Sequence, residues 1–312
     1  MQLHLKIVAA ISVVAFLGSC STAKKNLKLS QTSYCSPPNP YTYDSTYLPL
    51  ANMMPVLRED SALTKQYTYQ DLLIANATGT LFLLQDLTHL EESKSEENLL
   101  YKLLKKQQIF NRLLLASTEV ASLAAELDCE SERSKQLADY LDHRNDNRVQ
   151  RFTILSVVTG AITAIATLGN NTTNGQIVVG VVGSITSGVF GGLAAISSHQ
   201  TVVFKHERNL LSDIWYESKT SSFYPPCVWS ILNTKEFSNT GKHEPLHNLK
   251  ERWVTEGMIH ISDLTKEKLL FGNGGKYTAD DLHTRTNMIN QLKAEVRSVN
   301  QNLQTLMLKL SI

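Results

Sequence analysis

Apolar residues recur at alternating steps of three and four along three long stretches of the chain. These stretches are Ser61–Leu90, Glu96–Leu168 and a last one from about Ala279 to the end. Such spacing places side chains on one stripe of an α-helix, and a mostly apolar stripe packs against another helix. No glycine or proline occurs between Gly79 and Gly160. The second helix can therefore run unbroken for roughly 110 Å, which requires a partner along its length.

Two uncharged segments follow one another near the middle of the chain. They are Phe152–Gly169 and Gln176–Ser198, and the polar segment Asn170–Gly175 joins them. Asparagine, threonine and glycine are typical turn residues. A helix needs about 20 apolar residues to span a bilayer, and both arms are near that length. The pattern predicts a hydrophobic helical hairpin over Phe152–Ser198, with basic residues flanking it on both sides.

Small residues recur at every fourth position within this hairpin. Such rows let helices approach closely, as they do in membranes. In a water-soluble helix each glycine costs about 1 kcal/mol relative to alanine, so a tight helix–helix contact or a lipid environment is favoured. The candidate membrane-hairpin residues are Gly160, Ala164, Gly180, Gly183, Ser184, Gly188, Gly191 and Gly192.

The hairpin has two interpretations. In the first it contacts or enters a membrane. In the second it is the buried core of a helical bundle, packed against Ser61–Leu90 and Ala279–Ile312. We favour the first. The layout of a hydrophobic hairpin between long helices resembles that of α-helical pore-forming proteins, which implies a hairpin that inserts late. The resemblance is one of layout and carries over no residue.

The N-terminus has the features of an export signal. Lys6 precedes the short apolar run Ile7–Leu17, which is too short to span a bilayer. The run ends in Leu17-Gly18-Ser19-Cys20, which resembles the bacterial lipobox. The resemblance implies that Cys20 is acylated and becomes the first residue of the mature chain. With Ser21 next, it also implies lipid anchoring in the cell envelope, at the outer membrane facing the periplasm.

Three cysteines remain after such processing, namely Cys35, Cys129 and Cys227. An exported compartment permits disulfides, and three cysteines form at most one internal bridge. The sequence does not assign the pair.

The chain is thus expected to be an all-α protein, an elongated bundle of long helices with a hydrophobic helical hairpin. Within the C-terminal region we expect a helix to about Thr220, an irregular stretch with room for a short strand over Val228–Gly241, a helix over Leu246–Leu270 and a turn over Phe271–Lys276. The expected parts are a signal peptide (1–19), a Pro/Tyr-rich tether (20–58), long helices (59–151), the hairpin (152–198) and a helical C-terminal region completing the bundle (199–312).

One segment of the chain matches a catalytic motif. His243-Glu244-Pro245-Leu246-His247 matches the H-E-x-x-H spacing of zinc proteases, in which two histidines lie one helical turn apart. Proline belongs at the first position of a helix, so Pro245 predicts a helix start and leaves His243 outside it. No phosphate-binding loop or nucleophile elbow is present. We expect no enzymatic activity, cofactor or metal site.

The nearly balanced charge, with 30 basic and 29 acidic residues, gives no reason to expect a nucleic acid partner. The sequence favours a non-enzymatic envelope lipoprotein that contacts membrane lipid, as a homo-oligomer or within an envelope protein assembly. The alternative is a periplasmic helical scaffold that binds partner proteins through its long helices.

Overall fold

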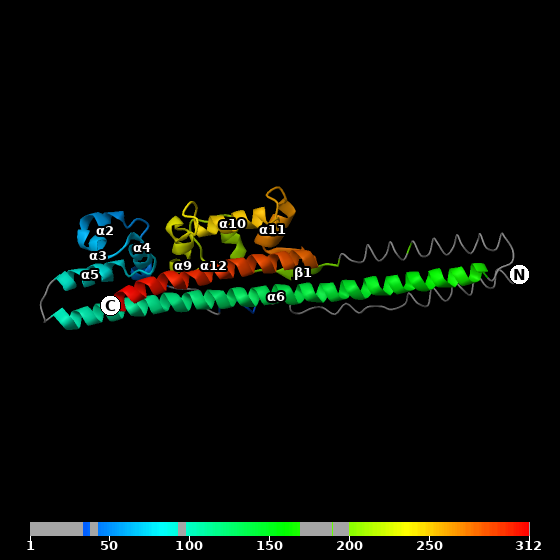
Figure 1. Ribbon diagram of the computed structural model, residues 1–312, viewed down its shortest axis with the longest axis horizontal. Coiled ribbons are helices and arrows are strands. Elements are labelled where there is room, and N and C mark those ends of the chain that lie inside the picture. The colour runs from blue at the N-terminus through cyan, green and yellow to red at the C-terminus, as the bar shows by residue number, and fades with distance from the viewer. Residues whose placement is uncertain (1–33, 38–42, 93–97, 169–188, 190–199, 312) are drawn as a thin grey trace.

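The computed structural model describes residues 34–37, 43–92, 98–168, 189 and 200–311, and in this part the chain is mostly helical. The molecule is elongated along α6 (Leu99–Leu168), a helix of 70 residues (Figure 1). At 1.5 Å per residue, α6 is about 105 Å long. The prediction of one very long helix is therefore confirmed.

Helix α12 (Ala279–Ser311) runs antiparallel beside the first part of α6 (Figure 1). Both helices bury residues at alternating steps of three and four, which is the spacing of a two-stranded coiled coil. Hydrogen bonds join Ser117 to Asn300 and Ser131 to Asn290 across the pair. The buried seam contains Leu113, Ala116, Val120, Leu123, Leu127, Ser134, Leu137 and Leu141 on α6, and Leu282, Ile289, Leu292, Val296, Val299, Leu303, Leu306 and Leu310 on α12.

The first expected helix, Ser61–Leu90, is wrong as a continuous element. The structure has three short helices there, α3 (Ser61–Gln66), α4 (Tyr69–Ala77) and α5 (Leu81–Glu92). Thr68 caps α4 through a reciprocal capping box with Asp71, which begins a new helix at that point. The apolar stripe correctly indicated which side chains are buried, but it did not indicate that the helix is interrupted.

Gly79 causes the second break. Its φ of +65° is favourable for glycine, and a Cβ there would lie 2.8 Å from the Thr46 carbonyl oxygen. Thr46 belongs to the short 3₁₀ helix η2 (Ser45–Tyr47), which is followed by α2 (Met54–Glu59). Arg112 of α6 donates hydrogen bonds to the carbonyl oxygens of both Thr46 and Gly79. This contact holds the short N-terminal helices against α6.

A two-stranded antiparallel ribbon corrects two further expectations. Strand β1 (Val202–Lys205) pairs with β2 (Gly274–Tyr277), with Val202 opposite Tyr277. The helix expected to about Thr220 is limited to α8 (Leu210–Trp215), and the turn expected over Phe271–Lys276 contains most of β2. Each strand gains its hydrogen-bond partner from the other, some 70 residues away in sequence, so local periodicity did not reveal them.

The remaining C-terminal helices are shorter than expected or lie elsewhere. Val228–Gly241 is not irregular throughout, because α9 (Pro226–Leu232) and the 3₁₀ turn η4 (Lys235–Phe237) occupy part of it. The helix expected over Leu246–Leu270 is divided into α10 (Pro245–Thr255) and α11 (Leu264–Phe271). Gly257, with a φ of +71°, lies in the break between them.

Candidate membrane-contact site

The C-terminal part of α6 extends beyond the body of the molecule. The pair between His283 of α12 and Asp142 of α6 lies near the first turn of α12, and α6 continues past it for 26 residues. Figure 1 shows this part of α6 projecting past the body. The predicted first arm of the hairpin begins at Phe152, so it lies on this projecting part of α6.

Apolar side chains on the projecting arm are exposed. Val157 is 65% exposed, and Ile154 and Val158 are also exposed. The buried-core interpretation required these side chains to be covered by the helices at Ser61–Leu90 and by α12. At Ile154, Val157 and Val158 they are not covered. Among the described residues, no helix has both the length and the apolar character needed to cross a membrane.

Only two of the candidate hairpin residues lie in the described chain. Gly160 and Ala164 both lie in α6, and Gly160 is half-buried. The other six, Gly180, Gly183, Ser184, Gly188, Gly191 and Gly192, lie outside the described residues.

The chain returns to the body beside the point where it leaves. Strand β1, which follows the predicted second arm in sequence, contacts α6 through Arg133. Arg133 of α6 donates a hydrogen bond of 2.7 Å to the Lys205 carbonyl oxygen, and its guanidinium lies 4.3 Å from the centre of the Phe204 ring. The described strand that follows the predicted second arm therefore contacts the same helix that carries the first arm.

A buried charged cluster lies where β1 and α12 pack against α6. Arg133 forms an ion pair of 2.9 Å with Glu130, and both side chains are almost fully buried. Arg285 of α12 is also buried, and it donates to the Asn209 side chain and to the Leu270 carbonyl oxygen. Burial lowers the pKa of Arg285. Buried charges are costly unless hydrogen-bonded, so this cluster restricts how α6, α12 and β1 can pack.

His206 is a buried neutral member of the same cluster. The Tyr277 hydroxyl donates to the Leu269 carbonyl oxygen, so its oxygen accepts a hydrogen bond from His206 Nε2–H, 2.7 Å away. Burial, and then the charges of Arg285 and Arg133, hold the pKa of His206 well below its usual range. His206 therefore adds no charge to the basic flank after the hairpin.

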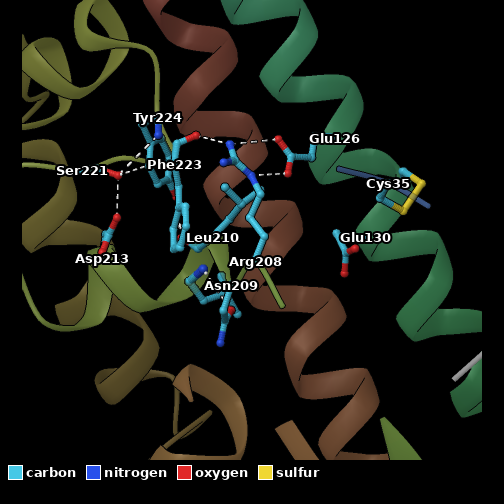
Figure 2. Close-up of polar contacts among 12 residues, drawn as sticks. Cys35, Glu126, Glu130, Arg208, Asn209, Leu210, Asp213, Ser221, Phe223 and Tyr224 are labelled. Carbon is cyan, nitrogen blue, oxygen red and sulfur yellow. Dashed lines mark hydrogen bonds and ion pairs between the residues drawn. A yellow bond between two sulfur atoms is a disulfide. The ribbon is translucent and has the colours of Figure 1, made fainter. Parts of the chain in front are cut away.

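Arg208, in the same flank, is also engaged with the body (Figure 2). It binds both carboxylate oxygens of Glu126, at 2.7 and 3.3 Å, and donates to the Phe223 carbonyl oxygen. Burial raises the pKa of Glu126, and the ion pair with Arg208 opposes this rise. Of Lys205, His206 and Arg208, Lys205 alone is exposed.

The structure assigns the cysteine pairing that the sequence left open. Cys35 and Cys129 form a disulfide with a Cα–Cα distance of 5.5 Å, which fastens the described residues 34–37 to the middle of α6. Cys227 is free and buried, and burial raises the pKa of its thiol. A buried neutral thiol is unreactive.

The H-E-x-x-H segment begins a helix, as Pro245 predicted. Pro245 is the first residue of α10, and His243 precedes the helix. The rings of His243 and His247 nevertheless lie 4.6 Å apart, and His247 Nδ1 lies 2.7 Å from a Glu217 carboxylate oxygen. Within the described residues, these histidines do not belong to a cluster of three convergent ligands.

Such a cluster occurs elsewhere, where sequence reasoning did not expect it. Asp139 and Asp142 of α6 converge with His283 of α12. The spacing of three between the two aspartates was visible in the sequence, but the approach of His283 depends on the helix pairing.

No protein-family model matches the chain, and neither the comparison with curated proteins nor that with solved structures finds a significant match. The class of the molecule therefore rests on the described fold, which is an elongated helical body with a single projecting helix (Figure 1).

Proposed function

We propose that this protein is a non-enzymatic envelope lipoprotein, held by acylated Cys20, whose hydrophobic hairpin contacts or inserts into a membrane. It acts as an assembly component or as a pore-former, either in a homo-oligomer or within an envelope protein assembly. One observation carries the proposal. The described first arm lies on the projecting end of α6, with Ile154, Val157 and Val158 exposed.

The energetic argument concerns these exposed side chains. Transfer of a valine or isoleucine side chain from water to an apolar environment is worth about 1.5–3 kcal/mol. The seam between α6 and α12 is almost completely buried, whereas these side chains on the arm stay in contact with water. Lipid, or the arm of a second copy, supplies the missing apolar environment.

The test compares two lysine substitutions on the same helix. Val157 on the arm and Leu114 on the body are 65% and 60% exposed, so lysine is tolerated sterically at both positions. The form starting at Ser21 is mixed with phospholipid vesicles that contain a trapped dye, and co-sedimentation and dye release are measured. We expect Val157→Lys to abolish binding and release, and Leu114→Lys to leave both unchanged.

Gly188→Lys, in the predicted second arm, is expected to act like Val157→Lys. A wild-type protein that ignores vesicles would overturn the membrane proposal. Equal losses in Leu114→Lys and Val157→Lys would show that binding does not depend on the arm.

The lipid anchor has its own test. Expression of the complete chain in a Gram-negative host with labelled palmitate should label the protein, and Cys20→Ser should abolish the label. An unlabelled wild-type chain would contradict the anchor without affecting the vesicle experiment.

A second candidate function rests on a different surface. At the start of α6, Leu100, Leu103 and Leu104 are exposed beside the exposed Tyr101. Exposed apolar clusters commonly mark protein contacts, so this end favours a periplasmic scaffold that binds partner proteins. A Leu100→Asp/Leu104→Asp variant that loses an envelope partner in crosslinking, while Val157→Lys retains it, would support the scaffold.

A further inference from the structure

Three side chains with metal-ligating groups converge where α6 leaves the body. Asp139 and Asp142 are three residues apart on α6, so they lie on one face of the helix. His283 reaches them from the beginning of α12. One ligand atom from each residue lies within 4.8 Å of the other two. Residues that are 141 positions apart in sequence therefore share one place in the fold.

We propose that Asp139, Asp142 and His283 bind a divalent transition-metal ion, for which zinc is the best match. Two carboxylate oxygens with one imidazole nitrogen form a mixed O/N ligand set. Calcium and magnesium favour sites made only of oxygen, whereas imidazole suits zinc and its neighbours. Three protein ligands leave a fourth tetrahedral position for water.

The geometry requires small side-chain movements. Zinc–ligand bonds of about 2.0–2.2 Å bring tetrahedral ligand atoms to about 3.4 Å from one another. The three side chains are nearly half exposed, so they have room to rotate by the required amount. The ion would take the place of the present hydrogen bond between His283 Nε2 and Asp142, which measures 2.8 Å.

A metal ion would have to displace the present partner of each of the two carboxylates. Lys135 forms an ion pair of 3.0 Å with Asp139, and this ammonium competes with a metal ion for that carboxylate. The pair between Asp142 and His283 is exposed, and exposed pairs contribute little to stability. A divalent cation would satisfy both carboxylates at once.

The site has a structural consequence for the projecting arm. A metal ion would fasten the beginning of α12 to α6 ten residues before Phe152, which is about 15 Å along the helix. Because the ion binds only the folded arrangement, it would also stabilise the pairing of α6 and α12.

The experiment titrates zinc, calcium and magnesium into the chelator-treated form starting at Ser21, followed by isothermal calorimetry and thermal unfolding. We expect one zinc ion per chain, with weak or no binding of the other two ions. His283→Gln and Asp142→Asn should each weaken zinc binding by about tenfold or more, because each removes a direct ligand. Lys135→Met should tighten it, because the competing ammonium is gone.

His247→Gln is the matched control, since His247 is also an exposed histidine beside a carboxylate. It should leave zinc binding unchanged. Absence of stoichiometric zinc binding, unchanged affinity in a well-folded His283→Gln variant, or loss of binding in His247→Gln would each overturn the proposal.

Discussion

At the scale of single residues, burial separates two ion pairs that look alike in sequence. Arg133–Glu130 and Lys135–Asp139 are both one-turn pairs on α6, but the first is almost fully buried and the second is about half exposed. Breaking a buried pair leaves one charge without compensation in a poorly solvated place. The buried pair therefore has far more influence on the fold than its exposed neighbour.

Glu130→Ala should lower the free energy of unfolding by about 3–5 kcal/mol, because Arg133 then stays buried without its carboxylate. Lys135→Ala should cause no measurable change. Urea denaturation followed by circular dichroism measures both. The double variant Glu130→Met/Arg133→Met should be less destabilised than Glu130→Ala, and a larger loss in the double variant would contradict this account.

His206 makes stability depend on pH. Its pKa in the folded protein lies well below the ordinary value of about 6.5 that it regains on unfolding. Below pH 6.5 the unfolded chain takes up a proton that the folded chain does not. Stability is therefore lost as pH falls from about 6.5 toward the folded pKa, and His206 has no such effect above that window.

The free energy of unfolding of His206→Gln should therefore fall less than that of the wild type between about pH 7.5 and 5.5. His260→Gln is the control, because His260 is exposed, and it should keep the wild-type slope. Carboxyls with raised pKa, such as Glu126, act in the opposite direction but equally in all three proteins. Identical slopes in wild type and His206→Gln would disprove the assignment.

At the scale of elements, α6 is one helix with two environments. Its first part pairs with α12 along a buried seam, whereas the described arm carries exposed apolar side chains. The disulfide between Cys35 and Cys129 joins the first part to a segment 94 residues away. A bridge that closes so long a loop restricts the unfolded chain strongly.

Cys35→Ser should therefore lower the free energy of unfolding by about 2–4 kcal/mol. The wild-type protein unfolded in a reducing agent should match the variant, while the variant itself should not respond to the reducing agent. Because Cys227 is buried, it should react with alkylating agents only after unfolding. A wild-type stability that does not change on reduction would contradict the role of the bridge.

At the scale of the whole molecule, the distance from Cys20 to Cys35 can be compared with the distance along α6 to the projecting arm. Cys20 and Cys35 are 15 positions apart, so the chain between them spans at most about 50 Å. Along α6, Phe152 lies about 35 Å from Cys129. The proposed acyl chain on Cys20 and the projecting arm can therefore reach the same membrane.

Small-angle X-ray scattering should give the form starting at Ser21 a maximum dimension of at least about 105 Å, the length of α6. A compact chain of this size would have a radius of gyration of about 19 Å, and the protein should exceed it clearly. Deletion of 152–198 should shorten the particle by at least about 25 Å. A compact wild-type particle would contradict the projection of α6.

Local periodicity predicted the two long helices that pair along the body, α6 and α12. The sequence showed both the three-four spacing of α12 and the absence of glycine and proline from α6 before Gly160, since burial on one helix face repeats with each turn. The same periodicity overestimated continuity at Thr68 and Gly79, where a cap and a positive φ begin new elements.

Only the tertiary structure decided which segments far apart in the sequence contact one another. Three contacts join segments about 70 or more residues apart. They are the pairing of β1 with β2, the disulfide between Cys35 and Cys129, and the hydrogen bond between His283 and Asp142. Spacing along the chain records which face of an element is buried. It does not record which other element covers that face, because that depends on how the helices pack together.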